Sequence, residues 1–416
     1  MPNFSIPLSG LTAESTALSA IANNLANQNT PGYKDTQVLF QDLFYQNLGT
    51  TGAGDPIQLG AGAAVGSMPG NFTQGSVTAT GVATDVAIQG GGFFIVQKDG
   101  VTSYTRAGDF SVDKNNFLVT ADGQQVLGYP AVNGVVNTGT GVGPLQIGAG
   151  TISPPSVTTT TQIQSNLNAG AQVGDVYSTP LTIYDSLGAA HTLTYTFTKT
   201  GANAWSYSLS VPTGDFTPPA NWQFPAGVVA QGTMTFDGNG NLLTPAANVT
   251  GITIPNLTDG ASDMNFEWDL YNGTSPVITQ VAADSSTSSA NQNGATSGTL
   301  TDFSIGSDGT ITGSFSNGKN AALGQIALAN FANVEGLEAN GSTNYAETLA
   351  SGQAVVGTAG NGGRGTLSGG SLELSNVDIA TEFANLIVAQ RAFEANAKAI
   401  TTFDQITQDT INLKQG

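Results

Sequence analysis

The last forty residues constrain the fold most, because glycine and proline are frequent in the rest of the chain but absent between Ser371 and Gln415. Apolar residues recur there at steps of three and four, which predicts one long helix from Ser375 to Leu413. Ser375 and Asp378 resemble a capping box and mark its expected start. At about 1.5 Å per residue the helix would be close to 60 Å long. Its predicted apolar face consists of Ile379, Phe383, Leu386, Phe393, Ala397, Ile400, Phe403, Ile406 and Leu413.

A helix of this length needs packing partners, because isolated helices gain little stability in water. A shorter helix is predicted near the other end, where Leu11 to Thr30 also lacks glycine and proline and where Pro31 and Gly32 prevent continuation. Its apolar face consists of Leu11, Leu18, Ile21 and Leu25. Near-heptad spacing in both segments predicts that the two ends pair as a coiled coil. The alternatives are a core helix of a large domain and two unrelated surface helices.

The charge balance excludes several classes of function. The chain has 29 acidic and 10 basic residues, a net charge of −19, so a nucleic-acid partner is not expected and an anionic membrane surface is disfavoured. Cysteine is absent and His191 is the single histidine, which removes most metal-site and catalytic-triad chemistry. No apolar run reaches the length of a membrane span, and the N-terminus lacks a cleavable signal, which by itself indicates the cytoplasm.

The middle of the chain is predicted to be β structure. It is rich in glycine, 54 residues in the whole chain, and in Asn-Gly and Asp-Gly pairs, which are typical of the tight turns between antiparallel strands. Two polar segments, 152–162 and 284–299, indicate the boundaries of an inserted domain. The clearest predicted strands are Val86–Gln89, Phe93–Gln97, His191–Phe197, Trp205–Val211, Met234–Phe236 and Asn265–Tyr271.

Two motifs lie on the two predicted helices. The first runs from Asn23 to Lys34, and the second runs from Leu372 to Asp378 and continues through Glu382-Phe383 to Gln390-Arg391. Together they resemble the terminal signatures of bacterial flagellar rod and hook proteins. Phe393-Glu394 departs from the family, which more often has Tyr-Gln there. The signature residues are Asn23, Asn24, Asn27, Asn29, Gly32, Tyr33, Ser375, Asn376, Val377, Asp378, Gln390 and Arg391.

The resemblance implies a mainly β fold with terminal α-helices, in which a discontinuous chain builds two β domains and the outer one is inserted into the inner one. The expected parts are a terminal helical coiled-coil domain (1–28 plus 376–416), a connecting segment (29–70 plus 366–375), an inner β domain (71–152 plus 299–365) and an inserted outer β domain (153–298). Family members order the stretch 33–70 through neighbouring subunits, so we expect it to be mobile in the monomer.

The resemblance also implies a function. It predicts a structural subunit, without enzymatic activity or cofactor, that self-assembles into the flagellar hook, a flexible tube that passes motor torque from rod to filament. The expected partners are further copies of the chain, the distal rod, the hook cap, the hook–filament junction proteins, the hook-length control protein and the flagellar export apparatus. Export by that apparatus places the chain outside the cell and overrides the cytoplasmic interpretation. The alternatives are a distal rod protein, which lacks so large an insertion, and an acidic extracellular glycan-binding β protein.

Other constellations are weaker. Asp237 to Asn241 imitates the start of a calcium loop, but Leu242 and Asn248 occupy the positions that require glycine and glutamate, so a hairpin turn is expected. Glu267 and Asp269 share one face of a predicted strand and could imitate a glycosidase carboxylate pair. We expect His191, which begins a strand, to be a surface residue. No catalytic, cofactor or metal residue is predicted.

Overall fold

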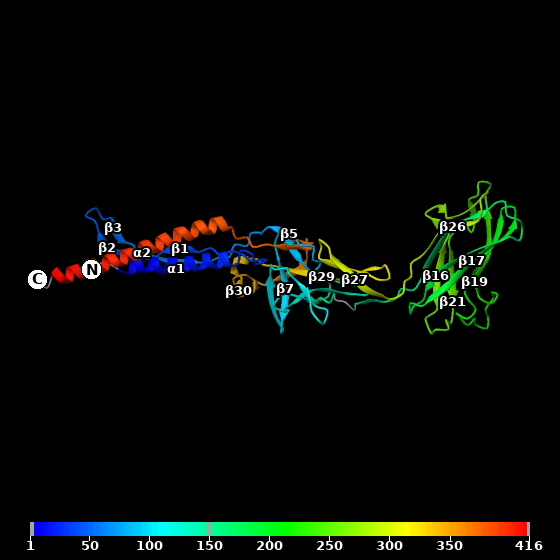
Figure 1. Ribbon diagram of the computed structural model, residues 1–416, viewed down its shortest axis with the longest axis horizontal. Coiled ribbons are helices and arrows are strands. Elements are labelled where there is room, and N and C mark those ends of the chain that lie inside the picture. Colours follow the sequence, from blue (N-terminus) through cyan, green and yellow to red (C-terminus); the bar gives the residue numbers. More distant parts are fainter. Residues whose placement is uncertain (1–3, 148–150, 414–416) are drawn as a thin grey trace. The chain divides into compact units, whose positions relative to one another are not determined.

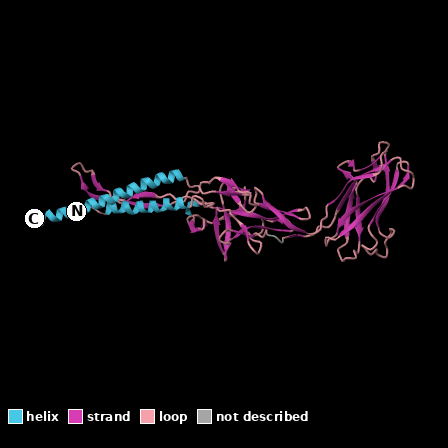
Figure 2. Cartoon of the chain, viewed as in Figure 1, coloured by secondary structure: helices cyan, strands magenta, loops and turns pink. Residues whose placement is uncertain are grey.

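The computed structural model describes residues 4–147 and 151–413 (Figure 1). The chain divides into two compact units. Unit 1 comprises Met1–Gly148, Phe303–Gly313 and Ala321–Gly416, and unit 2 comprises Ala149–Asp302 and Ser314–Asn320. Strands dominate both units and the long helices lie at the chain ends, which confirms the mainly β fold with terminal helices (Figure 2). The finer division of unit 1 into helical, connecting and inner β domains remains a prediction.

Two helices form one end of unit 1 and lie side by side, α1 (Ser5–Ala26) and α2 (Ile379–Leu413) (Figure 1). The connector after α1 forms two small antiparallel sheets. They pair β1 (Leu39–Asp42) with β4 (Ala63–Ser67) and β2 (Gln46–Thr50) with β3 (Pro56–Leu59). The predicted flexible linker therefore contains regular strands.

The main sheet of unit 1 is buried on both faces. Alternate residues of β7 enter two different apolar clusters, Phe94 and Val96 on one side and Phe93 and Ile95 on the other. This explains the uninterrupted apolar run in β7, because a strand covered on both faces has no polar side. The sheet runs in the order β28 (Thr310–Phe315), β29 (Asn320–Asn330), β11 (Gln125–Val132), β7 (Phe93–Lys98), β8 (Val101–Thr105), β31 (Asn344–Ala346) and β30 (Glu338–Gly341).

Short elements complete unit 1. Those attached to the main sheet are β9 (Ser111–Val112), β10 (Leu118–Val119), β12 (Val135–Val136), β13 (Gly143–Pro144) and β32 (Val355–Thr358). Separate two-stranded pairs are β6 (Val86–Gln89) with β33 (Thr366–Gly369) and β5 (Val77–Ala79) with β34 (Ser371–Glu373). A 3₁₀ turn, η1, covers Val334–Gly336. The β34 pairing brings the chain that enters α2 against the start of the β region.

Unit 2 is built from two sheets that share one core. Trp268 and Tyr195 come from opposite sheets, their ring centroids lie 5.0 Å apart, and both side chains are fully buried. The first sheet contains β21 (Val249–Ile254), β22 (Met264–Asp269), β15 (Thr160–Asn168), β25 (Ile278–Val281) and β26 (Ser286–Gln292). The second contains β16 (Val176–Tyr184), β17 (Ala190–Gly201), β18 (Ala204–Ser210), β19 (Val228–Phe236) and β20 (Leu242–Thr244). A small hairpin consists of β23 (Tyr271–Asn272) and β24 (Ser275–Pro276). Strand β14 (Ile152–Ser153) pairs with the start of β27 (Gly298–Ile305).

The structure corrects both predicted helix starts. Helix α1 begins at Ser5, six residues before Leu11, because Pro7 lies in the first turn, where a backbone N–H has no partner within the helix. Glycine fits at position 10, where a β-carbon would lie 2.9 Å from the amide nitrogen of Asn396 on α2. Helix α2 begins at Ile379, not Ser375, because Asp378 is the cap: its Oδ1 accepts the N–H groups of Ala380 (2.8 Å) and Thr381 (3.1 Å).

The two polar segments expected to be domain boundaries contain strand residues. Residues Ser286–Gln292 form β26, which pairs with β15 along its length, and β15 itself begins at Thr160. The polar composition of β26 hid this strand, because β26 lies at a sheet edge where exposed polar side chains are tolerated. The boundary segments are therefore shorter than the sequence indicates.

Candidate assembly surface and signature junction

Helices α1 and α2 pack antiparallel. Asn24 Nδ2 donates to Glu382 Oε1 (3.4 Å), Gly10 faces Asn396, and the rings of Phe4 and Phe403 meet edge to face at 6.0 Å. The partners on α2 therefore move toward its C-terminus as the position on α1 moves toward the N-terminus. The pairing of the two ends is present in the structure, and the interlocking side chains of a coiled coil remain a prediction.

The face that α1 buries consists mainly of small residues. The buried positions are Ala13, Ala17, Ala20 and Asn24, spaced by three and four, with Pro7 in the first turn. Small side chains let two helices approach closely, so the predicted leucine stripe lies beside the contact and is only half buried. On α2 the buried residues are Glu382 and Ala389.

Packing within the chain does not fully bury any predicted assembly residue whose side chain the structure describes. Eight of them are half buried, namely Leu11, Leu18, Ile21, Leu25, Leu386, Phe393, Ile400 and Phe403. Three are exposed, Ile379, Phe383 and Ile406, and the side chain of Leu413 lies outside the described residues. Four exposed apolar residues were missed, Leu8, Ile387, Val388 and Ile411, although Ile387 and Val388 stand within the second motif.

The connector exposes further apolar side chains. Phe44 is 94% exposed, and Leu39, Phe40, Tyr45 and Leu48 are also exposed. A cavity of about 420 Å³ opens between the two helices and the connector, lined by Ala17, Phe40, Val388 and two carboxylates, Glu14 and Glu382. Contiguous apolar surface of this kind marks an interaction site in a soluble protein. We define the assembly surface as these connector residues together with the exposed apolar residues of α1 and α2.

The first motif folds the chain back after α1. Asn24 Oδ1 accepts hydrogen bonds from the Tyr33 hydroxyl (3.0 Å) and the backbone N–H of Thr36 (3.1 Å), while its Nδ2 donates to the carbonyl of Thr36 (3.0 Å). Asn23 Nδ2 donates to the Tyr33 hydroxyl (3.0 Å), and Asn27 Oδ1 accepts from Thr30 Oγ1 (3.1 Å). Asparagine is required at 24 because its amide must donate and accept at the same place.

Gly32 is fixed by both its conformation and its neighbours. Its φ is +67°, and a β-carbon would approach the backbone nitrogen of Ala107 to an impossible distance. Its N–H donates to the carbonyl of Glu373 (2.8 Å). This glycine therefore lets the first motif contact the second.

Glu373 is the centre of a buried charge cluster that we call the junction triad, with Lys34 and Arg106. Lys34 Nζ donates to Glu373 Oε1 (2.6 Å), and Arg106 Nη1 donates to Oε2 (3.2 Å). The backbone N–H of Gly75 also donates to Oε1 (2.9 Å). Burial lowers the pKa of both Lys34 and Arg106, and their contacts with Glu373 oppose that shift. The sequence contained all three residues, but nothing in their spacing indicated that they meet.

The second motif is attached by Asn376. Its Oδ1 accepts the N–H of Asp35 (2.9 Å), and its Nδ2 donates to the carbonyl of Asn71 (2.7 Å). Ser375 Oγ accepts the N–H of Val377 (3.3 Å), just before the Asp378 cap. Asn29, Gln390 and Arg391 instead face solvent, and within the described chain Arg391 forms an ion pair with Glu394 at 3.4 Å. The signature residues therefore divide into a group that makes hydrogen bonds or close contacts at the junction and a group, Asn29, Gln390 and Arg391, that faces solvent.

Two carboxylates near the junction lack a full set of partners. Within the described residues, Glu382 Oε2 and Asp35 Oδ1 are buried and accept no hydrogen bond. Burial raises the pKa of Glu382; the amide of Asn24 opposes this shift and the charge of Asp35 adds to it. Glu382 lines the cavity between the helices and the connector, where an added donor would stabilise its unpartnered oxygen.

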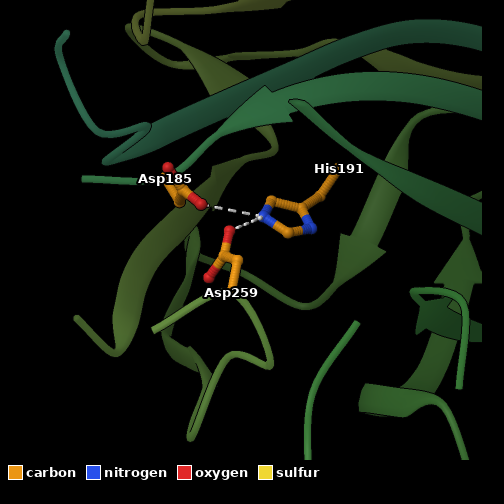
Figure 3. A group of neighbouring side chains, drawn as sticks. All are labelled: Asp185, His191 and Asp259. Carbon is orange, nitrogen blue, oxygen red and sulfur yellow. Dashed lines mark hydrogen bonds and ion pairs between the residues drawn. The ribbon is translucent and has the colours of Figure 1, made fainter. Parts of the chain in front are cut away.

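In unit 2, His191 is buried, and the prediction of a surface histidine is wrong. Figure 3 shows its ring facing Asp185 and Asp259. Its Nδ1 lies 3.0 Å from Asp215 Oδ2, and its Nε2 lies 3.1 Å from Asp185 Oδ2 and 3.7 Å from Asp259 Oδ2. Burial lowers the pKa of His191, but the hydrogen bonds with Asp185 and Asp215 outweigh burial and raise it above its ordinary value. The strand alternation placed His191 on the inner face, and that signal was available in the sequence.

The other constellations have structural roles. Asp237 Oδ1 accepts the N–H groups of Asn239 (2.9 Å) and Asn241 (2.8 Å), so this carboxylate shapes the β19–β20 turn. Asn248 Nδ2 donates to both Glu267 Oε1 (3.1 Å) and Asp269 Oδ1 (2.7 Å), which ties the two acids to a neighbouring segment. No helix in the described part of the chain has the length and hydropathy needed to cross a membrane.

Family profiles define the class of this protein. The flagella basal body rod protein profile matches residues 6–34, and the flagellar basal body rod FlgEFG protein C-terminal profile matches 368–413. The flagellar hook protein FlgE/F/G D1 domain matches 87–166, and the flagellar basal body protein FlaE D2 domain matches 157–295. The chain is thus a structural protein of the bacterial flagellum, from the group that forms rod and hook.

Full-length relatives specify the family. The chain is 38% identical to the flagellar hook protein FlgE of Salmonella typhimurium, over 99% of this chain and 100% of that protein, and 37% identical to the one from Escherichia coli over the same shares. The solved Helicobacter pylori hook protein FlgE2 aligns with 71% of this chain and all of its own, at 16% identity and a TM-score of 0.48. The chain belongs to the flagellar hook protein family. This membership favours the hook over the distal rod and the glycan-binding alternatives.

Proposed function

We propose that this chain is the subunit of a flagellar hook and that copies of it polymerise through the assembly surface. The observation that carries the proposal is the full-length match to hook proteins, together with apolar side chains that remain exposed on α1, α2 and the connector. Copies of the same chain supply matching apolar surface, and burial of one large side chain stabilises an interface by about 1.5–3 kcal/mol. Polymerisation therefore completes the packing that the helices need.

The interface in this proposal includes the predicted residues of both helices. Leu11, Leu18, Ile21 and Leu25 act from α1, and Ile379, Phe383, Leu386, Phe393, Ile400, Phe403, Ile406 and Leu413 act from α2. The exposed signature residues Gln390 and Arg391 lie beside them. The junction triad couples this helical end to the β strands of unit 1, so that force applied to the polymer passes through hydrogen-bonded and charged contacts within each subunit.

The proposed hook lies outside the cell, next to the basal body, and transmits torque from rod to filament. Its further partners are the distal rod, the hook cap, the hook–filament junction proteins, the hook-length control protein and the flagellar export apparatus. The role is mechanical and not enzymatic: the paired acids Glu267 and Asp269 share one asparagine donor, and Trp268 between them is buried in the core. The inserted domain, expected at 153–298, faces outward in this arrangement.

Immunogold electron microscopy tests the proposal in the bacterium that encodes the chain. An antibody against residues 155–290 is applied to intact flagella and to detergent-extracted basal bodies, with the purified chain as a positive control for binding. We expect gold along the short curved segment outside the envelope. Gold confined to the straight segment inside the envelope would identify a rod protein, and the absence of flagellar label would reject the proposal.

A further inference from the structure

The carboxylates around His191 are arranged by their own loops (Figure 3). Asp185 follows β16, and its Oδ1 accepts the N–H groups of Leu187 (2.8 Å) and Ala189 (2.9 Å), which leaves Oδ2 directed at the imidazole. Asp259 does the same in another loop, since its Oδ1 accepts the N–H of Ala261 (3.0 Å) and its Oδ2 faces the ring. Two carboxylate oxygens from separate loops therefore converge on one ring nitrogen, Nε2.

A proton on Nε2 accounts for only one of these two contacts. An N–H group donates along one direction, and the 3.1 Å separation from Asp185 fits a hydrogen bond, whereas the 3.7 Å separation from Asp259 does not. Among the described residues, the ion pairs of Asp185, Asp215 and Asp259 all involve His191 and no lysine or arginine. A protonated ring would thus place one positive charge among three carboxyl groups.

We propose that Asp185, His191 and Asp259 bind one divalent transition-metal cation, and that Zn²⁺ suits the donor set best. Zinc accepts imidazole nitrogen and carboxylate oxygen at about 2.0–2.2 Å, which separates neighbouring donors by about 3.4 Å in a tetrahedral site. The distances of 3.1 and 3.7 Å from Nε2 lie on either side of that value, and the three ligand atoms lie within 4.8 Å of one another. Movements of about 0.3 Å bring the two nitrogen–oxygen separations to that value.

Asp215 supplies the supporting contact that such a site requires. Its Oδ2 lies 3.0 Å from Nδ1 of His191, and when it accepts the N–H of that nitrogen the Nε2 lone pair is directed toward Asp185 and Asp259. The backbones of Asp215 and Thr258 are hydrogen bonded (3.0 Å), so the support and the ligand Asp259 belong to neighbouring loops. Asp259 is exposed, which provides a route for the ion and a fourth position for water. The bound ion joins the loops at this edge of unit 2.

Zinc titration of the full-length, untagged chain tests the site. The protein is dialysed against EDTA, then titrated with ZnCl₂ in a calorimeter, and its thermal unfolding is recorded with and without zinc. We expect saturable binding of one ion per chain and a rise in Tm. Asp259→Asn, at an exposed position, should fold normally and weaken zinc binding by more than about tenfold. His191→Gln should abolish binding.

Asp284→Asn is the matched control, because Asp284 is an exposed carboxylate of the same unit outside the cluster. It should bind zinc as the native chain does. Equal zinc affinity in the native chain and in Asp259→Asn, or the absence of saturable binding, would overturn the proposal. A Tm that rises on acidification but does not respond to zinc would show that a proton occupies the position instead, and would also overturn it. None of these outcomes bears on polymerisation through the helices.

Discussion

Unit 2 and the helical end of unit 1 use apolar residues in opposite ways. Strand β17 of unit 2 alternates buried and exposed side chains, and Leu193, Tyr195 and Phe197 are completely buried within the chain. Helix α2 instead leaves Phe383, Ile387 and Val388 more than half exposed. Unit 2 therefore has its packing partners within the chain, whereas the helical end has an apolar face whose partners must come from other molecules.

The largest expected effect is from removing residues 377–416, which deletes α2 and leaves the junction triad and both β regions in place. We expect polymerisation to be lost completely, because the deleted helix carries six exposed apolar residues of the assembly surface, Ile379, Phe383, Ile387, Val388, Ile406 and Ile411. The β regions should remain folded, since their cores contain no residue of α2. Electron microscopy of polymers and circular dichroism of the strands measure the two effects. Loss of the strand signal would contradict the independence of the two regions.

A single charge on the exposed face of α2 should block assembly and leave folding of the monomer almost unchanged. Phe383→Asp is expected to block polymerisation, because it places a carboxylate in an interface that the proposal makes apolar. Monomer stability should change by less than about 1 kcal/mol, since Phe383 is 52% exposed. Thr402→Asp, an exposed position outside the apolar stripe, is the control and should assemble. Normal polymers of Phe383→Asp would show that the interface uses another face.

Breaking the junction triad should destabilise unit 1 alone. Glu373→Ala leaves Lys34 and Arg106 buried without their carboxylate, and loss of one partner of a buried ion pair costs about 3–5 kcal/mol. Denaturation is followed by two signals. The three tryptophans, Trp205, Trp222 and Trp268, all lie in unit 2, so their fluorescence should keep its midpoint while part of the circular dichroism transition moves to lower denaturant. A shift of both signals would show that the units unfold together.

The smallest expected effect is a pH dependence at Glu382. Because burial raises its pKa in the folded chain, its contribution to the free energy of unfolding is fully present below its ordinary pKa of 4.5 and is lost as pH rises through the raised value. Glu382→Gln stays neutral, so the helical end should depend less on pH across that window. Hydrogen exchange of α1 and α2 at several pH values measures the difference. An unchanged profile in the variant would mean that Glu382 is already stabilised at neutral pH.

The sequence predicted the elements better than their contacts. Period-two alternation located β17, β18 and β22, and the apolar run at Phe93 located β7, because those patterns are local. It missed β26, whose polar side chains carry no burial signal, and it placed the helix starts wrongly at Leu11 and Ser375. It also missed the junction triad, since Lys34, Arg106 and Glu373 are far apart in the chain and only the fold brings them together.

In the candidate sites, too, the sequence did not predict which distant residues lie in contact. The helical stripe predicted where apolar residues would gather, but not that Ala13, Ala17 and Ala20 would take the buried position and leave the leucines half exposed. His191 was interpreted from its place at the start of a strand, because Asp215 and Asp259 approach it from loops that the sequence could not place. Which side chains of distant loops lie together depends on how the strands pair, and a local sequence pattern does not indicate that pairing.

Hydrogen–deuterium exchange of the monomer and of its polymer tests the central claim most directly. The claim is that the helical end gains its packing from other copies, whereas unit 2 already has it. We predict that amides of α2 exchange quickly in the monomer and become strongly protected in the polymer, while amides of β17 and β22 are protected equally in both. Protection of α2 that is already complete in the monomer, or a gain in the polymer confined to unit 2, would contradict the account.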